Sequence, residues 1–329
     1  MKLAIYSTKP YERKYIESAN KGKHELFFFE EALSLETVYK ANGCDAISIF
    51  TNDDASAEVL EIIKKLNIRS IAVRAAGYDN VDLKKAAEFS FKVANVPDYS
   101  PYSIAEHAAM LILALNRKVV QADHKVKDYN FLLDELIGFD LNGRTIGIIG
   151  VGKIGGILAK IMNGFGCKVL GFDIKENKDY TEKYNLQYVS LDEMYQKADI
   201  ISLHAPLNEH TKYMINKESI NKMKDRVMIV NTGRGGLINT IDAIDALKSG
   251  KIGYLGLDVY EKEKGLFFYN HSADIMQDDV FARLLTFKNV IITGHQAFLT
   301  ENALKNIADT TINNIDSWQS GNKAKNELF

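Results

Sequence analysis

Short runs of apolar residues alternate with stretches of helical periodicity along nearly the whole chain. A strand that helices cover on both faces reads as a continuous apolar run, so this alternation predicts an α/β fold with doubly wound parallel sheets. A first set of strands is predicted at residues 3–6, 46–49, 70–73 and 92–93, and a second set at residues 145–149, 168–172, 200–203, 227–231, 254–257 and 290–292. The second set is large enough for a complete dinucleotide-binding sheet.

A proline-stiffened turn separates the two sets of strands. Its sequence is Asn95-Val96-Pro97-Asp98-Tyr99-Ser100-Pro101, and it leads into a helix predicted over residues 103–117 that is apolar on nearly every side. A chain of 329 residues exceeds what one hydrophobic core usually serves. We therefore predict two domains with an interdomain cleft, joined by a buried helix whose apolar surface suits a dimer interface equally well. Another helix is predicted over residues 300–317, followed by a frayed tail at 320–329.

Composition and charge narrow the class of partner. The 41 basic and 43 acidic residues give a net charge of −2 with no strong block of one sign, which argues against nucleic acid or a membrane and favours a small molecule. Cys44 and Cys167 lack disulfide or zinc spacing, so both are predicted to be buried and unpaired. With no signal-peptide core, no membrane-spanning run and no metal-binding motif, we expect a cytoplasmic protein that uses no catalytic metal.

A glycine-rich turn, Gly150-Val151-Gly152-Lys153-Ile154-Gly155, directly follows the strand predicted at residues 145–149 and opens a helical pattern. In such a turn Gly150 permits the tight bend, Gly152 lets the backbone approach a pyrophosphate, and Gly155 allows the helix to pack closely on the strand. The N–H groups at the start of the helix then face the phosphates. This strand, turn and helix predict a dinucleotide site that includes Lys153 and Ile154.

An acidic residue ends the next predicted strand. Asp173 follows residues 168–172, close to the spacing of about 20 residues at which an acid meets the adenosine ribose. A carboxylate accepts hydrogen bonds from the ribose hydroxyls and repels a 2′-phosphate, and Ile174 stands where an arginine would favour that phosphate. The cofactor is therefore predicted to be NAD, although Lys175 lies close enough to keep NADP open.

Polar residues suited to chemistry on a 2-keto acid follow three later strands. Arg234, between glycines at a strand end, is suited to grip a carboxylate bidentately and to polarise a neighbouring carbonyl. His295 follows the last predicted strand, where a histidine is the usual proton carrier near neutral pH. A carboxylate beside it would orient the ring and stabilise the imidazolium. Asp258, Glu261 and Glu263 all lie near enough in sequence to be that partner.

The other histidines are weaker candidates. His107 lies inside the apolar helix and is predicted to be a packed core or interface residue, and His204 follows a strand where it can line the nicotinamide pocket without titrating. Surface or loop positions are predicted for His24, His124, His210 and His271.

Taken together, these segments resemble the D-specific 2-hydroxyacid dehydrogenase family over essentially the whole chain. The resemblance rests on Val73-Arg74-Ala75-Ala76-Gly77-Tyr78-Asp79-Asn80-Val81-Asp82, the proline-stiffened turn, the glycine turn, Asn231-Thr232-Gly233-Arg234-Gly235, Gly256-Leu257-Asp258-Val259-Tyr260-Glu261 and Gly294-His295-Gln296-Ala297-Phe298. The stretch from Gly265-Leu266-Phe267-Phe268 to Asp279-Val280-Phe281 is especially like the lactate branch of the family.

The resemblance implies roles for these residues in reducing pyruvate to D-lactate with NADH. Arg234 would bind the substrate carboxylate and carbonyl, and His295, paired with Glu263, would donate the proton. Substrate contacts are implied at Ala76, Gly77, Tyr99 and Phe298. Predicted cofactor contacts are Gly150, Gly152, Lys153, Ile154, Gly155, Asp173, His204, Ala205, Pro206, Thr232, Gly233 and Asp258.

The same resemblance implies a discontinuous division of the chain. Residues 1–100 and 299–329 would form a flavodoxin-like substrate domain, and residues 101–298 an NAD-binding Rossmann domain. Relatives carry, near residues 129–139, an arm that can reach a neighbouring subunit's active site, and we expect a homodimer or a dimer of dimers.

Three other interpretations compete with the lactate one. A sister dehydrogenase would act on a bulkier acid such as 2-ketoisocaproate, so the preferred side-chain size stays open. A 3-phosphoglycerate dehydrogenase is disfavoured because no appended regulatory domain and no additional basic residues near Tyr99 are seen. An NAD-sensing transcriptional corepressor shares the fold and the Arg/Glu/His set, but its peptide-binding and DNA-linked additions are not evident.

Overall fold

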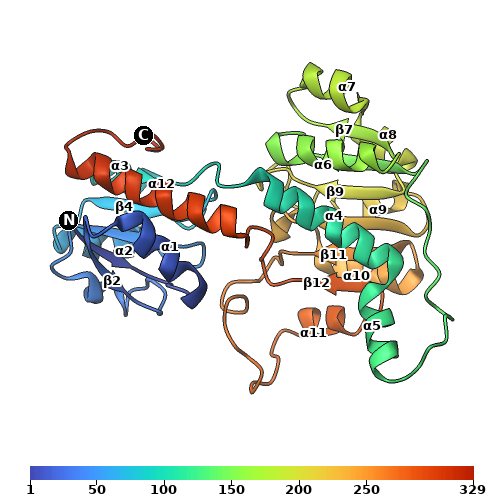
Figure 1. The fold of residues 1–329 in the computed structure, drawn as a ribbon, viewed down its shortest axis with the longest axis horizontal. Helices are drawn as coiled ribbons and strands as arrows, with labels where there is room; N and C mark the ends of the chain where they lie inside the picture. Colours follow the sequence, from blue (N-terminus) through green and yellow to red (C-terminus); the bar gives the residue numbers. More distant parts are fainter. The chain divides into compact units, whose positions relative to one another are not determined.

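The computed structural model describes all residues from Met1 to Phe329, which form two compact units. Unit 1 comprises residues 1–100 and 299–329, and unit 2 comprises residues 101–298 (Figure 1). Each unit is built around its own parallel sheet, and each is described by itself below.

Unit 1 contains a five-stranded sheet in the order β2-β1-β3-β4-β5, with every neighbouring pair parallel. This is the flavodoxin-like strand order. Its elements are β1 (Lys2–Ile5), α1 (Pro10–Asn20), β2 (Glu25–Phe28), η1 (Val38–Ala41), β3 (Ala46–Ile49), α2 (Ala57–Lys65), β4 (Ser70–Val73), α3 (Leu83–Glu88), β5 (Lys92–Ala94) and, from the C-terminal segment, α12 (Glu301–Gln319).

Unit 2 contains a seven-stranded parallel sheet in the order β12-β11-β10-β9-β6-β7-β8. The order reverses beside β6, as in a dinucleotide-binding sheet, and ligands bind such sheets outside the carboxyl ends of the strands at this point. The elements are α4 (Pro101–Arg117), α5 (Val119–Lys127), β6 (Thr145–Ile149), α6 (Lys153–Gly164), β7 (Lys168–Phe172), α7 (Lys178–Tyr184), β8 (Leu186–Tyr188), α8 (Leu191–Lys197), β9 (Ile200–Leu203), α9 (Lys217–Lys222), β10 (Val227–Asn231), η2 (Gly235–Leu237), α10 (Thr240–Ser249), β11 (Ile252–Leu257), α11 (Asp279–Leu285) and β12 (Val290–Ile292).

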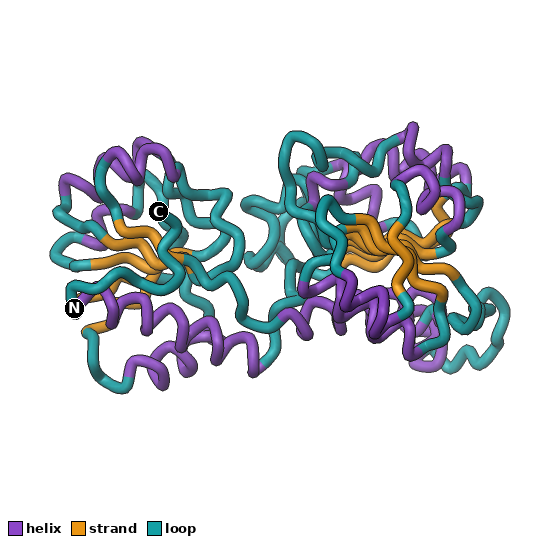
Figure 2. The backbone as a smooth tube through the Cα atoms, turned by 90° about the horizontal axis from the view of Figure 1, so that it is seen from above, coloured by secondary structure: helices purple, strands orange, loops and turns teal.

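In both units the strands lie in one layer between helices, as Figure 2 shows. The central strands β3, β4, β9, β10 and β11 are buried along their whole length because helices cover both of their faces. In unit 2 one core cluster includes Leu111, Ile112 and Leu115 of α4 together with Leu158 of α6. The predicted fold class, two α/β domains with parallel sheets, is therefore confirmed.

Each sheet has one strand more than the sequence analysis predicted. The missed strands are β2 and β8, and both lie at a sheet edge. β2 has no fully buried residue, and β8 has only Leu186 buried. β8 is short and has the polar Gln187 between Leu186 and Tyr188, so it offers no continuous apolar run. β2 lies in the apolar run Leu26-Phe27-Phe28-Phe29, which the sequence analysis did not recognise as a strand.

The C-terminal tail is ordered against unit 1, so the prediction of a frayed tail was wrong. The Leu328 N–H donates to the Val93 carbonyl at 2.8 Å, and Trp318 Nε1 donates to Glu327 Oε2 at 3.0 Å. Ala324 is buried. These tertiary contacts, which no local pattern signals, hold the last residues along the edge strand β5.

His24 is another correction, because it is buried and does not lie at the surface. Its Nε2 lies 2.8 Å from Asp316 Oδ1 of α12, and its main chain exchanges hydrogen bonds with the Asn20 side chain. It therefore links the end of α1 to the C-terminal helix. Cys44 and Cys167 are free and buried, as predicted.

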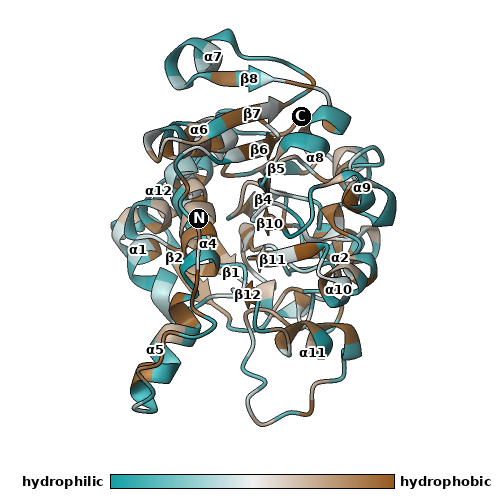
Figure 3. Ribbon diagram, turned by 90° about the vertical axis from the view of Figure 1, so that its right-hand side faces the viewer, coloured by the Kyte–Doolittle hydropathy of each residue, from teal (hydrophilic) through white to brown (hydrophobic).

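The short helix α5 and the segment after it carry exposed apolar residues. No residue of α5 is buried, and hydrophobic and hydrophilic residues alternate along it in Figure 3. Phe131, Leu132 and Leu133 are also largely exposed. By contrast, α4 buries most of its apolar residues within unit 2. No helix in the protein is long and apolar enough to cross a membrane.

Candidate functional site

The glycine turn lies between β6 and α6 of unit 2. Gly150 has a φ of +91°, which an L side chain rarely adopts. A Cβ at Gly155 would lie 2.1 Å from the Gly150 carbonyl oxygen, so only glycine lets the helix pack this closely on the turn. A Cβ at Gly152 would meet no atom within 4 Å, so this position faces open space at the helix N-terminus. The backbone there is accessible to a ligand.

A second segment contacts this turn. A Cβ at Gly150 would lie 2.5 Å from the Ala205 nitrogen, which shows how closely residues 204–205 approach the turn. The His204 ring accepts or donates a hydrogen bond with Ser202 Oγ at 2.9 Å, and desolvation by burial lowers the pKa of His204 to about 4. The ring is therefore neutral near pH 7. Pro206 follows with its ring exposed.

Thr232 supplies a test of whether the site suits a dinucleotide. Its Oγ1 is buried and has no hydrogen-bond partner in the protein. A buried polar atom without a partner is costly, and a bound polar ligand is one way to satisfy it. Gly233 continues the same loop and donates its N–H to Asn231 Oδ1 at 3.0 Å. The open backbone at Gly152 and the unsatisfied hydroxyl of Thr232 both fit a polar cofactor along this edge of the sheet.

Asp173 stands at the end of β7 beside the glycine turn. Its Oδ2 accepts a hydrogen bond from the Val151 N–H at 2.7 Å, and its Oδ1 accepts one from the Lys175 N–H at 3.1 Å. The carboxylate is therefore held against the turn, although residues 151 and 173 are far apart in sequence. The side chain of Ile174 is fully exposed.

Arg234 lies just beyond β10, in a loop fixed by Asn231. The Asn231 side chain accepts the Gly233 N–H and donates from Nδ2 to the Arg234 carbonyl at 2.9 Å. Gly235 brings this loop against the one after β11, because a Cβ there would lie 2.1 Å from the Tyr260 carbonyl carbon. Arg234 and the residues after Tyr260 are thus carried by neighbouring loops at one edge of the sheet.

His295 pairs with Glu263. The Nδ1 atom of His295 lies 2.8 Å from Glu263 Oε1, and both side chains are about one-fifth exposed. Glu263 Oε2 accepts the Tyr260 N–H at 3.0 Å, which orients the carboxylate. His295 has a φ of +53°, and its N–H donates to the Asp258 carbonyl at 2.7 Å. These contacts hold a strained backbone, so that Nδ1 faces the carboxylate and Nε2 faces away.

The other two candidate acids have different partners. Asp258 is fully buried, and its carboxylate accepts hydrogen bonds from Thr293 Oγ1 and from the N–H groups of Gln296 and Ala297. Glu261 Oε2 accepts the Tyr213 hydroxyl at 2.8 Å. Of the three carboxylates, only Glu263 contacts the His295 ring.

Asp258 predicts a pH dependence of stability. Burial raises its pKa, but hydrogen bonds from His107, Thr293 and the N–H groups of residues 296 and 297 outweigh burial, so the pKa lies below its ordinary value. Because the unfolded chain binds this proton more readily, the stabilisation is present above the unfolded pKa of about 4 and is lost as pH falls through the folded pKa.

We therefore expect Asp258→Asn to reduce the free energy of unfolding by about 1–3 kcal/mol at neutral pH, since an amide cannot accept all of these bonds. The variant should also lose less stability than the wild type on acidification. Urea titrations at several pH values measure both effects. Asp225→Asn, which removes a solvent-exposed ion pair with Lys251, is the control and should change little. Parallel acid dependence in wild type and Asp258→Asn would contradict this prediction.

The predicted substrate contacts of unit 1 lie in loops after β4 and β5. Ala76 and Gly77 follow β4, and Asn95 Nδ2 donates to the Ala76 carbonyl at 2.8 Å. The Tyr99 carbonyl accepts a hydrogen bond from Asn306 Nδ2 at 2.6 Å. In unit 2, Phe298 is buried at the end of the segment that carries His295.

Two contacts near His295 were not anticipated from the sequence. The Phe268 ring lies against the imidazole, with centroids 5.8 Å apart and planes 37° apart, and its own φ is +70°. His107 is a packed residue whose Nε2 lies 2.9 Å from Thr293 Oγ1 and 3.3 Å from Asp258 Oδ1. Both contacts join residues distant in the chain, and an aromatic or histidine in isolation gives no signal of them.

Comparison with known proteins identifies the family of the chain. Residues 109–297 match the family model described as D-isomer specific 2-hydroxyacid dehydrogenase, NAD binding domain. A 2-hydroxyacid dehydrogenase homolog of Haemophilus influenzae is 49% identical over 99% of this chain and 98% of its own. D-lactate dehydrogenase of Escherichia coli is 46% identical over 100% of both chains.

The solved apo structure of D-lactate dehydrogenase from Escherichia coli superposes with a TM-score of 0.91 and 44% identity, covering 100% of both chains. The match extends through both sheets and is not limited to the dinucleotide-binding unit. The chain therefore belongs to the D-isomer specific 2-hydroxyacid dehydrogenase family, as an NAD-dependent enzyme whose residues 109–297 match the NAD-binding domain of that family.

Proposed function

We propose that the protein reversibly reduces pyruvate to D-lactate, with unit 1 binding the substrate and His295 acting as the general acid and base. The observation that carries this proposal is the His295–Glu263 contact of 2.8 Å. Glu263 holds Nδ1, so Nε2 is the atom that delivers a proton to the keto oxygen and removes one from the hydroxyl in the reverse direction. A carboxylate partner fixes the ring orientation that this transfer needs.

Two groups receive the negative charge of the substrate. Arg234 lies in the loop that packs against the loop after β11, and its Nη1 donates to the Gly233 carbonyl at 3.0 Å. Its guanidinium is suited to bind the carboxylate while polarising the keto oxygen. Ala76 and Gly77 offer backbone N–H groups, neither of which has an acceptor in the protein. Such adjacent N–H groups bind anions well. Tyr99 and Phe298 would enclose the remainder of a small acid.

The cofactor, when bound, supplies the hydride for reduction. Gly150, Gly152 and Gly155, with Lys153 and Ile154 at the start of α6, would hold its pyrophosphate. Asp173 would hold the adenosine ribose. The remaining cofactor contacts proposed are His204, Ala205, Pro206, Thr232, Gly233 and Asp258. The low pKa of His204 leaves His295 as the histidine that moves a proton there.

Substitution of Gly152 tests this assignment through binding. Gly152 has φ −76° and ψ −156°, which other residues adopt, and its Cβ position is open. Gly152→Val should therefore fold normally but place methyl groups where the pyrophosphate lies. We expect NADH affinity, measured by fluorescence titration, to fall by about 100-fold with an unchanged melting temperature. Gly164→Val, at the open last position of the same helix, is the control. Equal NADH affinity in both variants would contradict the assignment.

The choice of pyruvate rests on the 46% identity with D-lactate dehydrogenase of Escherichia coli. The second candidate is a D-2-hydroxyacid dehydrogenase for a bulkier acid such as 2-ketoisocaproate. Rates of NADH oxidation with pyruvate, 2-ketoisocaproate, hydroxypyruvate and glyoxylate separate the candidates. We expect the highest kcat/KM with pyruvate. A higher value with 2-ketoisocaproate would favour the second candidate, and no turnover with any of them would overturn the proposed function.

We also propose that the protein is a cytoplasmic homodimer or dimer of dimers. Val119 and Val120 of α5 are about half exposed, and Phe131, Leu132 and Leu133 are more exposed still. Exposed apolar residues that gather in one surface patch are usually covered by another protein surface, and a subunit contact would cover these. Light scattering on the purified protein measures its mass, and a monomer at micromolar concentration would contradict this assembly.

A further inference from the structure

Residues 75–79 form the loop after β4 that carries the two N–H groups without acceptors. We propose that Arg74 and Asn80 are positioning residues, which anchor the two ends of this loop so that the N–H groups of Ala76 and Gly77 meet the substrate carboxylate. The inference deepens the proposed function and rests on it. It assigns a role to two side chains that do not themselves touch the substrate.

The loop has a defined orientation. The Ala75 carbonyl accepts the Val96 N–H at 3.0 Å, and the Ala76 carbonyl accepts Asn95 Nδ2 at 2.8 Å. Across a planar trans peptide, the carbonyl and the following N–H point in opposite directions. The N–H groups of Ala76 and Gly77 are therefore turned away from the β5 loop. Both residues are partly exposed, so an anion from solvent can reach them.

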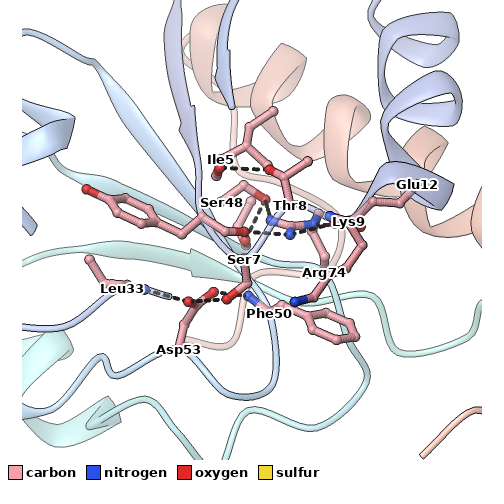
Figure 4. A network of polar contacts seen from close by, with 12 residues as sticks. Ile5, Ser7, Thr8, Lys9, Glu12, Leu33, Ser48, Phe50, Asp53 and Arg74 are labelled. Carbon is pink, nitrogen blue, oxygen red and sulfur yellow. Dashed lines mark hydrogen bonds and ion pairs between the residues drawn. The ribbon is translucent and has the colours of Figure 1, made fainter. Parts of the chain in front are cut away.

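Arg74 anchors the first end of the loop. Its side chain is fully buried, and Figure 4 shows it at the centre of a polar network. Nε and Nη2 donate to the two carboxylate oxygens of Glu12 at 3.2 and 3.1 Å. Nη1 donates to Ser48 Oγ at 3.1 Å, and Nη2 also donates to the Tyr6 carbonyl at 2.8 Å. One planar group thus ties the end of β4 to α1, to β3 and to the segment after β1.

Stability alone does not account for such a buried ion pair. Desolvating a guanidinium and a carboxylate offsets most of their attraction, and well-packed apolar residues of similar volume are often equally stable. What the guanidinium adds is geometry, because its rigid fork has donors in fixed directions. Placed directly before Ala75, that fork determines where the loop leaves the sheet.

Asn80 anchors the second end of the loop. Its Nδ2 donates to the carbonyls of Phe50 and Asp53 at 2.9 and 2.7 Å, and its own carbonyl accepts the Ala55 N–H at 3.1 Å. The Asp53 side chain is itself buried and accepts hydrogen bonds from Ser7 Oγ at 2.7 Å and from the Leu33 N–H at 2.6 Å. Asn80 is therefore attached to a segment that is fixed in turn.

The experiment compares Asn80→Ala and Arg74→Lys with the wild type in steady-state kinetics with pyruvate. Lysine keeps the charge opposite Glu12 but lacks the fork, which limits the risk of unfolding. A misplaced loop weakens binding of the carboxylate in ground and transition states alike, so we expect KM to rise by about 10-fold in each variant with a smaller change in kcat. NADH affinity, which depends on unit 2, should be unchanged.

Asn20→Ala is the matched control. Asn20 also lies in unit 1 and donates its Nδ2 to a backbone carbonyl, that of His24 at 2.9 Å, but it does not contact the loop. It should lower the melting temperature and leave KM unchanged. If both test variants retain the wild-type KM, or if Asn20→Ala raises KM equally, the anchoring role is overturned. Absence of wild-type turnover with every 2-keto acid would instead overturn the proposed function, and the inference with it.

Discussion

Replacement of His295 by glutamine is expected to lower kcat by about 1000-fold, because general acid and base catalysis contributes roughly 100- to 10,000-fold in enzymes. Glutamine can occupy similar space and form hydrogen bonds, but it carries no proton that it can transfer near neutral pH. The backbone of residue 295 is held by hydrogen bonds to Asp258 and Thr293, and glutamine retains both N–H bonds. NADH oxidation with pyruvate measures the loss, and NADH titration should give an unchanged affinity.

His271→Gln is the matched control for this prediction. His271 also pairs through Nδ1 with a carboxylate, that of Asp274, at 2.8 Å, but it lies in the exposed loop before α11. It should retain wild-type kcat. Near-normal turnover of His295→Gln would show that another group supplies the proton, whereas equal losses in the two variants would show that loop disruption explains the effect.

Arg234→Lys is expected to lower kcat/KM for pyruvate by about 100- to 1000-fold, since loss of one preorganised donor to a developing oxyanion has effects of this size. Lysine keeps the positive charge but cannot bind a carboxylate and polarise the neighbouring oxygen with one planar group. The loop itself should persist, because Asn231 holds it through the main chain of residues 233 and 234.

The kinetic pattern of Arg234→Lys separates two roles. A rise in KM with an equal kcat would mean that the guanidinium binds substrate and transition state alike, and a fall in kcat would show a contribution to the transition state. Arg283→Lys, on the exposed side of α11, is the control and should match the wild type. An unchanged kcat/KM in Arg234→Lys would remove this residue from the site.

The central strands of both sheets could be predicted from the sequence, and so could the edge strands β5 and β12, but the edge strands β2 and β8 were missed. β6, β7, β9 and β10 coincide with the predicted ranges, because strands with both faces covered require uninterrupted apolar runs. β8 is short and mixes polar with apolar residues, as many loops do, whereas β2 was missed although Leu26-Phe27-Phe28-Phe29 is apolar. His24 and the C-terminal tail were also mispredicted, because each is held by contacts with segments that are distant in the sequence.

The glycine turn and its acid illustrate what local patterns can carry for the site. Gly150, Gly152 and Gly155 lie within one short segment, so the local sequence alone indicates the turn that they form. The partner of His295 is a different case. Asp258, Glu261 and Glu263 lie within one short loop. Asp258 accepts a hydrogen bond from Thr293 and Glu261 accepts one from Tyr213, whereas Glu263 contacts His295. These hydrogen bonds join segments that are far apart in the chain, so the sequence alone does not show which carboxylate pairs with His295.

The most direct test of the account is the oxidation of the two lactate enantiomers by the wild-type protein in the presence of NAD. Formation of NADH with D-lactate, and little with L-lactate, is the result that the proposed reaction predicts, because the preference for the D isomer follows from the family to which the chain belongs. Faster NADH formation with L-lactate, or none with either enantiomer under conditions in which the protein binds NADH, would contradict the account.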